Sequence, residues 1–162
     1  TNDQNLLDNF HKKSRRGRSA ALNLVITETG AGEAVGQVLP ELKGKLTANA
    51  IRVPTPNVSL AIMKLHLRKK SDSFELNNFL RQIAFHSSYK DQIDFTNSSE
   101  IVSSDFVGNR YAGIIDSAAT ICHGNNSILY VWYDNEFGYT VQLLGLAKEM
   151  VGLTYKRYPE YQ

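Results

Sequence analysis

The sequence lacks most of the features that mark secreted or membrane-bound proteins. It contains one cysteine, Cys122, so it cannot form an internal disulfide bond. Its apolar runs are too short to cross a bilayer, and no basic-then-apolar signal segment opens the chain. These absences predict a soluble protein of a reducing compartment, most simply the cytoplasm, with no membrane partner.

A large excess of one charge is also missing. Eighteen Lys and Arg residues balance 16 Asp and Glu residues, so the net charge of +2 indicates no special class of partner. The 162 residues are 42% hydrophobic, which is enough apolar material for one folded domain. A starting Met is absent as well, and we expect the chain to be an interior piece of a longer protein or a processed product.

The hydrophobic pattern predicts elements in the order β-α-β-β-α-β-β-β-α. Thr29 and Ser73 are expected to cap the first two helices, and residues 124–126 are expected to form a hairpin turn. Because hairpin-like links dominate, we predict an α/β (α+β) fold whose mixed, mostly antiparallel sheet has helices packed on one face. The strands are predicted at residues 20–27, 46–53, 58–68, within 93–106, 110–121 and 127–133.

The residues that most often carry catalysis are placed poorly for it. Cys122 and His123 are neighbours on a predicted strand and would point to opposite faces, so a buried, inert thiol is favoured over a nucleophile. The four histidines are scattered without metal-ligand spacing, and the sequence predicts no metal site. The glycines at residues 30–36 do not have the spacing of a dinucleotide-binding turn.

Four features could bind a ligand, and each also has a purely structural interpretation. Thr29-Gly30 could hold a phosphate at a helix N-terminus or simply cap the helix, and Arg52 could grip a phosphate or be a surface arginine. The basic segment 11–18 could contact nucleic-acid phosphates, but it lacks interleaved aromatic residues, and a solvated or subunit-facing loop is favoured. Asn135 could cap the last helix or present its amide to a ligand.

Five stretches of the sequence closely resemble signature segments of glyceraldehyde-3-phosphate dehydrogenases. The resemblance covers residues 1 to about 152 in the order of that family, and the opening residues 1–4 resemble its bacterial and plastid form. The five stretches are residues 29–31 (TGA), 39–46 (LPELKGKL), 52–59 (RVPTPNVS), 102–106 (VSSDF) and 132–139 (WYDNEFGY).

The resemblance implies a mechanism and a set of ligands. In this family a cysteine thiolate attacks the aldehyde of glyceraldehyde 3-phosphate, hydride passes to NAD, and inorganic phosphate cleaves the thioester to give 1,3-bisphosphoglycerate. The activity belongs to glycolysis and gluconeogenesis, and the enzymes are homotetramers. Use of NADP in place of NAD stays open, because the discriminating residues lie mainly outside this chain.

The resemblance also implies roles for particular residues. Thr1, Asp3 and Arg52 match the substrate-phosphate pocket, and Thr29-Gly30 match the inorganic-phosphate pocket. Arg16 lies in the loop that reaches towards these pockets and the neighbouring subunit, so residues 1–23 are expected to form a basic subunit-contact loop rather than a nucleic-acid site. Asn135 matches the residue that holds the carboxamide of the nicotinamide ring.

Two parts of the family pattern are absent from the sequence. The Cys-Thr-Thr-Asn stretch that carries the nucleophile is missing, as is the histidine base, so no catalytic residue of the family lies in this chain. We therefore expect residues 1–152 to be the C-terminal, substrate-binding domain without its dinucleotide-binding partner, and to be inactive alone. Residues 153–162 form a tail of no predicted role. The alternatives are part of an erythrose-4-phosphate dehydrogenase and a non-catalytic anion- or nucleic-acid-binding module.

Overall fold

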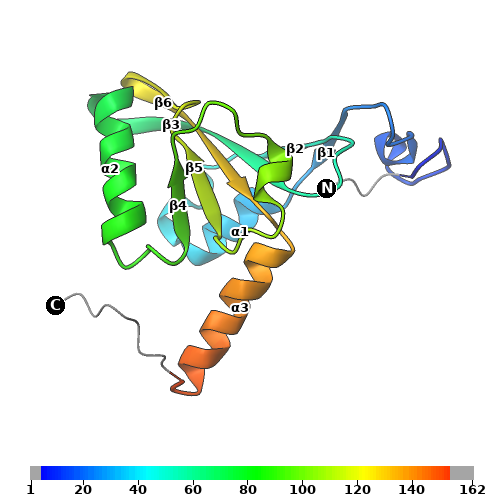
Figure 1. Cartoon of the computed structure of the whole chain (residues 1–162). Helices are drawn as coiled ribbons and strands as arrows, with labels where there is room; N and C mark the ends of the chain where they lie inside the picture. Colours follow the sequence, from blue (N-terminus) through cyan, green and yellow to red (C-terminus); the bar gives the residue numbers. More distant parts are fainter. Residues whose placement is uncertain (1–4, 154–162) are drawn as a thin grey trace. The chain divides into compact units, whose positions relative to one another are not determined.

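The computed structural model describes residues 5–153, and the chain divides into two compact units, Thr1–Pro56 and Asn57–Gln162. The helices and strands follow the predicted order β-α-β-β-α-β-β-β-α (Figure 1). The described residues also form three short 3-10 helices, one before β1 and two between later elements. The predicted single domain over residues 1–152 stays a prediction, and each unit is described by itself.

The first unit is built on a pair of short antiparallel strands. Strand β1 (Val25–Glu28) pairs with β2 (Asn49–Arg52), and both are shorter than the sequence predicts. Helix α1 (Ala31–Val38) connects them, and it ends before the 3-10 helix η2 (Pro40–Leu42) because proline cannot continue the hydrogen-bonded helix. A further 3-10 helix, η1 (Ser14–Gly17), lies in the basic segment. Among the described residues, buried apolar contributions to this unit come from Ala20 and Val25.

The second unit contains a four-stranded sheet in the order β3-β6-β5-β4. The strands are β3 (Ser59–Asp72), β4 (Ile93–Thr96), β5 (Gly113–Asp116) and β6 (Ile121–Tyr133). All neighbours pair antiparallel except β4 and β5, which are parallel. This confirms the predicted mixed, mostly antiparallel sheet.

Helix α2 (Ser73–His86) packs against β3, β4 and β6 (Figure 1). The predicted cap, Ser73, is wrong by one position, because the Asp72 side chain accepts the hydrogen bond from the Glu75 amide at 2.9 Å. A carboxylate is also the better cap, since it complements the positive end of the helix dipole. Ser73 instead bridges to the sheet, where its hydroxyl accepts from the Cys122 amide at 2.9 Å.

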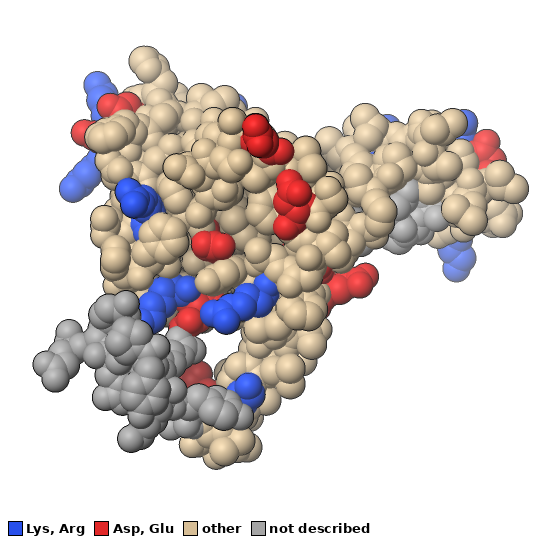
Figure 2. Space-filling view, in the orientation of Figure 1, with Lys and Arg blue, Asp and Glu red and all other residues tan. Residues whose placement is uncertain are grey.

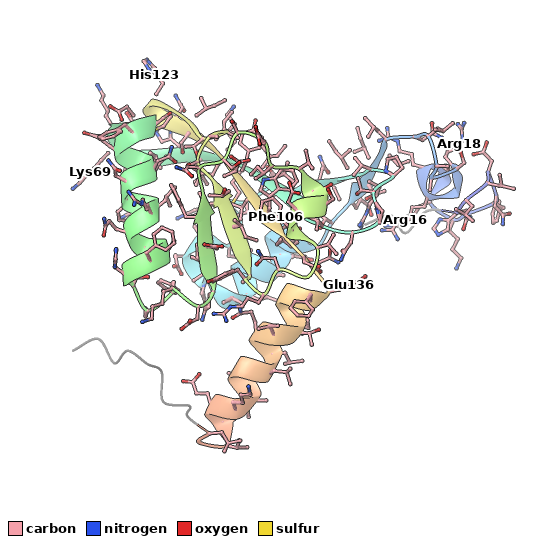
Figure 3. The ribbon with its side chains drawn as sticks, viewed as in Figure 1. Arg16, Arg18, Lys69, Phe106, His123 and Glu136 are labelled. Carbon is pink, nitrogen blue, oxygen red and sulfur yellow. The ribbon has the colours of Figure 1, made fainter. Side chains whose placement is uncertain are left out.

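The core of the second unit gathers around Phe106, which is labelled in Figure 3. Phe106 ends the 3-10 helix η3 (Ser103–Phe106), where Asp105 accepts a hydrogen bond from the Val102 amide at 2.8 Å. Its ring stacks on Trp132 with centroids 5.5 Å apart, and it joins the buried side chains of Val58 and Ile114. Stacked rings add to the stabilisation that burial alone supplies.

Helix α3 (Phe137–Met150) leaves the sheet at the end of β6 (Figure 1). Gly138 sits against the loop after η3, where an added Cβ would lie 2.6 Å from the Tyr111 carbonyl oxygen, so only glycine fits there. Residues 143–150 are all exposed, and an apolar row runs along them: Leu143, Leu146 and Met150. Within residues 5–153 no helix has both the length and the apolar character needed to span a membrane.

Two predictions about the sheet are wrong. The strand predicted at residues 110–121 is confined to β5, and a turn at residues 117–119 follows it. Residues 124–126 do not form a hairpin turn but lie inside the continuous strand β6, which pairs with β3 along most of its length. The Gly-Asn-Asn sequence is instead used at a bulge between His66 and Ser71 of β3, where Asn125 donates to the Leu67 carbonyl at 2.8 Å. Pairing with a long neighbouring strand outweighs the local turn preference.

Candidate functional site

The strand pair of the first unit brings Arg52 next to a buried hydroxyl. The register pairs Arg52 with Val25 and places Thr27 on the same face of β1, since side chains two residues apart share a face. The Arg52 Nε donates to the Thr27 hydroxyl at 3.3 Å, and Thr27 is 8% exposed. This contact turns the guanidinium towards the carboxyl end of β1, the end that leads into Thr29 and α1.

Thr29 and Gly30 form the entry to α1. The Thr29 hydroxyl accepts a hydrogen bond from the Ala31 amide at 3.3 Å, but the predicted cap is wrong by one position, because Gly30 is the N-cap residue of α1 and makes no side-chain capping bond. A Cβ at Gly30 would meet nothing within 4 Å, so the space beside its backbone is open. The first amides of a helix have no partner within the helix, and they attract anions. The exposed Glu33 in this first turn already makes a favourable interaction with the dipole.

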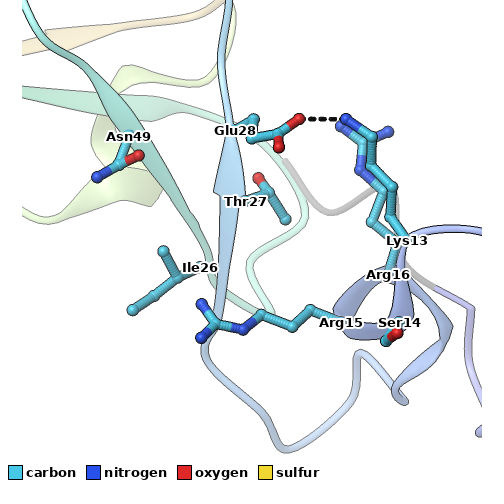
Figure 4. A pocket seen from close by; sticks show the side chains of 8 residues that line it. All are labelled: Lys13, Ser14, Arg15, Arg16, Ile26, Thr27, Glu28 and Asn49. Atoms are coloured by element: carbon cyan, nitrogen blue, oxygen red, sulfur yellow. Dashed lines mark hydrogen bonds and ion pairs between the residues drawn. The ribbon is translucent and has the colours of Figure 1, made fainter.

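A cavity of about 420 Å³ lies between the basic 3-10 helix η1 and β1 (Figure 4). Arg16 and Thr27 both line it, but Arg52, Thr29 and Gly30 do not. The Lys13 ammonium pairs with the Glu28 carboxylate at its rim, and hydrogen bonding to Lys13, then its charge, lowers the pKa of Glu28. The full lining is Lys13, Ser14, Arg15, Arg16, Ile26, Thr27, Glu28 and Asn49.

Thr27 is therefore shared by two groups of predicted residues. Its hydroxyl binds Arg52 on one side, and its side chain borders the cavity that contains Arg16. Sequence reasoning missed Thr27, although a polar residue on the same face of a strand as a buried apolar one is a usable signal. Thr1 and Asp3 lie outside the described residues.

Asn135 lies in the second unit, between the end of β6 and α3. Its Oδ1 accepts a hydrogen bond from the Ser59 hydroxyl at 3.3 Å, and Asn135 is exposed. The capping interpretation of Asn135 is wrong, because the Asp134 carboxylate accepts from the Glu136 and Phe137 amides, each at 2.9 Å. The Asn135 amide nitrogen is left for a different contact.

Cys122 is a buried thiol, as the strand pattern predicts. It is 8% exposed and its Sγ contacts the Ser71 carbonyl oxygen at 3.4 Å. His123, labelled in Figure 3, is exposed on the other face of β6. The pair cannot act as nucleophile and base, because neither touches the other.

Charge on the surface is mixed. On the face shown in Figure 2, the Lys and Arg side chains of the described residues are interspersed with Asp and Glu, and no continuous basic stripe forms. A nucleic-acid interface usually shows such a stripe. This face of the described residues gives no support to the alternative of a nucleic-acid-binding module.

Comparison with known proteins decides the family. The model of the glyceraldehyde 3-phosphate dehydrogenase C-terminal domain matches residues 1–135. The chain belongs to this family. The Arg52–Thr27 contact, the α1 entry and Asn135 thus lie in a glyceraldehyde-3-phosphate dehydrogenase domain, as the sequence motifs predict.

Curated relatives support the same assignment. A glyceraldehyde-3-phosphate dehydrogenase-like protein of Pseudomonas aeruginosa is 60% identical over 98% of this chain, which corresponds to 34% of that protein. Glyceraldehyde-3-phosphate dehydrogenase 2 of Trichormus variabilis is 43% identical, over 91% of this chain and 44% of its own length. Glyceraldehyde-3-phosphate dehydrogenase 1 of Bacillus subtilis is also 43% identical, with 91% and 44% covered. The chain thus spans a third to a half of these relatives.

Proposed function

We propose that this chain is the substrate- and phosphate-binding part of an NAD-dependent, phosphorylating glyceraldehyde-3-phosphate dehydrogenase. The observation that carries the proposal is the contact between Arg52 and the buried Thr27 beside the entry of α1. It fixes a guanidinium on a buried hydroxyl that lies two residues before Thr29 in the sequence, and guanidinium groups and helix N-termini both bind phosphate oxygens well. The longer protein that contains this chain is called the full-length dehydrogenase below.

In this proposal the two anion positions have different partners. Arg52, with Thr1 and Asp3, binds the phosphate of glyceraldehyde 3-phosphate. The Thr29 hydroxyl and the open backbone at Gly30 receive the inorganic phosphate, and the cation of Arg16 stands in the neighbouring cavity. The Arg52 and Arg16 cations and the amides at the start of α1 stabilise negative charge as preformed charges and dipoles.

The residues present also fit a nicotinamide cofactor at one point. Asn135 is exposed and its amide oxygen is bound by Ser59, so its amide nitrogen can donate to the carboxamide of the ring. NAD, when bound, accepts the hydride that leaves the substrate. The contribution of Asn135 is to hold the ring with one face towards the substrate.

The proposal also requires groups from outside this chain. Cys122 is buried and His123 does not contact it, so neither replaces the thiolate and base of the family mechanism. We propose that a cytoplasmic homotetramer of the full-length dehydrogenase supplies both, and that this chain alone is inactive. The exposed apolar row of α3, Leu143, Leu146 and Met150, is surface that such an assembly can cover.

Substitution of Arg52 tests the proposal. In the full-length dehydrogenase, Arg52→Ala should lower kcat/KM for glyceraldehyde 3-phosphate. The expected loss of transition-state stabilisation is roughly 2–4 kcal/mol, which is usual when a charge-assisted contact is removed. Arg68→Ala is the matched control, because Arg68 is an exposed arginine of β3, in the unit that carries no proposed phosphate position. Equal kcat/KM for Arg52→Ala and the unaltered enzyme would refute the assignment.

One observation favours a second candidate, an erythrose-4-phosphate dehydrogenase that needs no inorganic phosphate. The Glu28 carboxylate borders the same cavity as Arg16 and opposes a second anion there. Measuring NADH formation with both aldehydes, with and without phosphate, separates the two. Phosphate-dependent oxidation of glyceraldehyde 3-phosphate supports the first candidate, and phosphate-independent oxidation of erythrose 4-phosphate supports the second.

A further inference from the structure

Asp134 makes more contacts than the cap of a helix requires. Its Oδ1 accepts from the Glu136 and Phe137 amides, which is the capping interaction of α3. Its Oδ2 accepts from the Asn57 side-chain amide at 3.0 Å and from the Gly108 amide at 2.9 Å. The residue is 2% exposed, so four donors satisfy a carboxylate that is almost completely removed from water.

These four bonds join three segments that are distant in the sequence. Asn57 lies just before β3, Gly108 follows η3, and residues 136–137 start α3. Burial by itself raises the pKa of Asp134, but the bonds from Gly108, the α3 amides and Asn57 outweigh it and hold the pKa below its usual value. The carboxylate therefore stays charged in the folded unit and keeps all three segments in place.

The segment that Asp134 holds through Asn57 is strained. Val58, the next residue, has a φ of +70°, a backbone conformation that is unfavourable for a β-branched side chain. Val58 is 4% exposed and packs in the core with Phe106 and Ile114. Backbone strain of this kind persists only where many surrounding contacts hold the conformation, and it is frequent at functional sites.

Asn135 lies at the centre of this arrangement. The residue before it carries the clamping carboxylate, the amide of the residue after it is bound to that carboxylate, and Ser59, two residues after Asn57, binds its Oδ1. The bonds of Asp134 fix the backbone on both sides of Asn135, and the bond from Ser59 fixes its amide oxygen. The amide nitrogen then has one preferred direction.

We propose that Asp134 is a positioning residue that sets the direction in which the Asn135 amide nitrogen points, through its bonds to Asn57, Gly108 and the start of α3. The inference rests on the proposed function for its ligand, the carboxamide oxygen of a nicotinamide ring. It goes further, because it assigns the orientation of that contact to a carboxylate that does not itself touch the ring.

Side-chain NMR on this chain tests the positioning role directly. Asp134→Asn keeps the shape but turns one of the two acceptor oxygens into an NH2 donor, so two of the four hydrogen bonds are lost. We expect the heteronuclear NOE of the Asn135 side-chain amide to fall to values typical of a free surface asparagine, and its NOE contact with Ser59 to vanish. An Asn135 amide that stays as ordered as in the unaltered chain would overturn the proposal.

Asp116→Asn is the matched control. Asp116 is also buried, at 6% exposed, and its carboxylate accepts from Trp132 Nε1 at 3.1 Å and from the Ala119 amide at 3.0 Å. We expect this change to lower stability while leaving the Asn135 amide ordered. If both variants mobilise Asn135 to the same degree, Asp134 acts only on general stability and the proposal is wrong.

A milder variant covers the case in which Asp134→Asn does not fold. Asn57→Ala removes one of the four donors and leaves the helix cap intact. We expect the Asn135 amide to become partly mobile, with a weaker contact to Ser59. An unchanged Asn135 in this variant also overturns the proposal.

A second readout separates this inference from the proposed function. In the full-length dehydrogenase, Asn135→Ala should raise the KM for NAD and reduce the selectivity for one face of the ring, and Asp134→Asn should do the same. Asn135→Ala could leave both the KM for NAD and the face selectivity unchanged while Asp134→Asn mobilises the Asn135 amide in this chain. That result would refute the cofactor role of Asn135 and support the positioning role of Asp134. If Asn135→Ala raises the KM for NAD but Asp134→Asn does not, the positioning role of Asp134 is refuted and the cofactor role of Asn135 is supported.

Discussion

The two units of this chain differ in what their buried residues do. In the second unit, long strands of 14 and 13 residues surround a stacked Phe106–Trp132 pair and the fully buried Ile114. In the first unit, strands of four residues bury Val25 and a hydroxyl that binds an arginine. The difference indicates that the second unit supplies stability, whereas the anion-binding groups of the proposed function lie in the first.

The charged residues follow the same division. Two ion pairs of the first unit, Lys13–Glu28 and Arg18–Asp8, involve side chains that are more than half exposed. Such pairs contribute little to stability because water and salt screen them. The buried carboxylates Asp116 and Asp134, in contrast, both belong to the second unit and bind donors inside it.

The largest expected effect on stability tests the claim that the second unit supplies most of it, and it concerns the core of that unit. Ile114→Ala should lower the free energy of unfolding by about 2–5 kcal/mol, because it leaves a cavity beside a residue that is 1% exposed. Urea unfolding followed by the fluorescence of Trp132, the single tryptophan, reports on this unit. Leu22→Ala in the first unit is the control, since Leu22 is 93% exposed and its loss should change little. Similar losses for the two variants would contradict the division.

The next effect is the dependence of the second unit on pH. The folded pKa of Asp134 is lowered, so its contribution to stability is complete above the ordinary carboxyl pKa near 4 and is lost as the pH falls through the folded value. Thermal unfolding followed by Trp132 should therefore show a falling midpoint below about pH 4. Asp134→Asn should flatten that dependence, and an equally steep fall in this variant would show that other groups cause it.

The smallest effect sharpens the role of the first unit. Glu28→Gln removes an exposed pair with Lys13, which should change the free energy of unfolding by less than about 1 kcal/mol. It also removes a negative charge at the rim of the cavity that contains Arg16, so sulfate should bind more tightly. Calorimetric titration with sulfate measures this change. Weaker sulfate binding in the variant would contradict an anion site in this cavity.

Much of the fold could be predicted because hydrophobic periodicity determines it. The order of helices and strands follows from local patterns, as does the burial of Cys122 opposite His123. The turn predicted at residues 124–126 is wrong, since pairing between β6 and β3 outweighs a local preference that sequence alone displays. Likewise, Asp72 rather than Ser73 caps α2 because the helix begins one residue earlier than the sequence pattern predicts.

The candidate site was less accessible to sequence reasoning. Arg52 and Thr29 could be selected from their positions at the ends of elements, but the partner of Arg52 could not. Thr27 becomes that partner only through the register of β1 and β2, which brings together residues 25 positions apart. Asp134 could not be preferred over Asn135 as the cap of α3, because both residue types cap helices well.

The most direct test of the central claim is an NMR titration of this chain with inorganic phosphate. We predict saturable shifts at the backbone amides of Gly30 and Ala31 and at the Arg52 side chain, and no comparable shifts in the second unit. Arg52→Ala should leave the shifts at Gly30 and Ala31 in place, because they report the other anion position. Phosphate that leaves these three residues unchanged, or that binds instead at the exposed cations Arg68, Lys69 and Lys70 of β3, would contradict the claim that the first unit holds the anions.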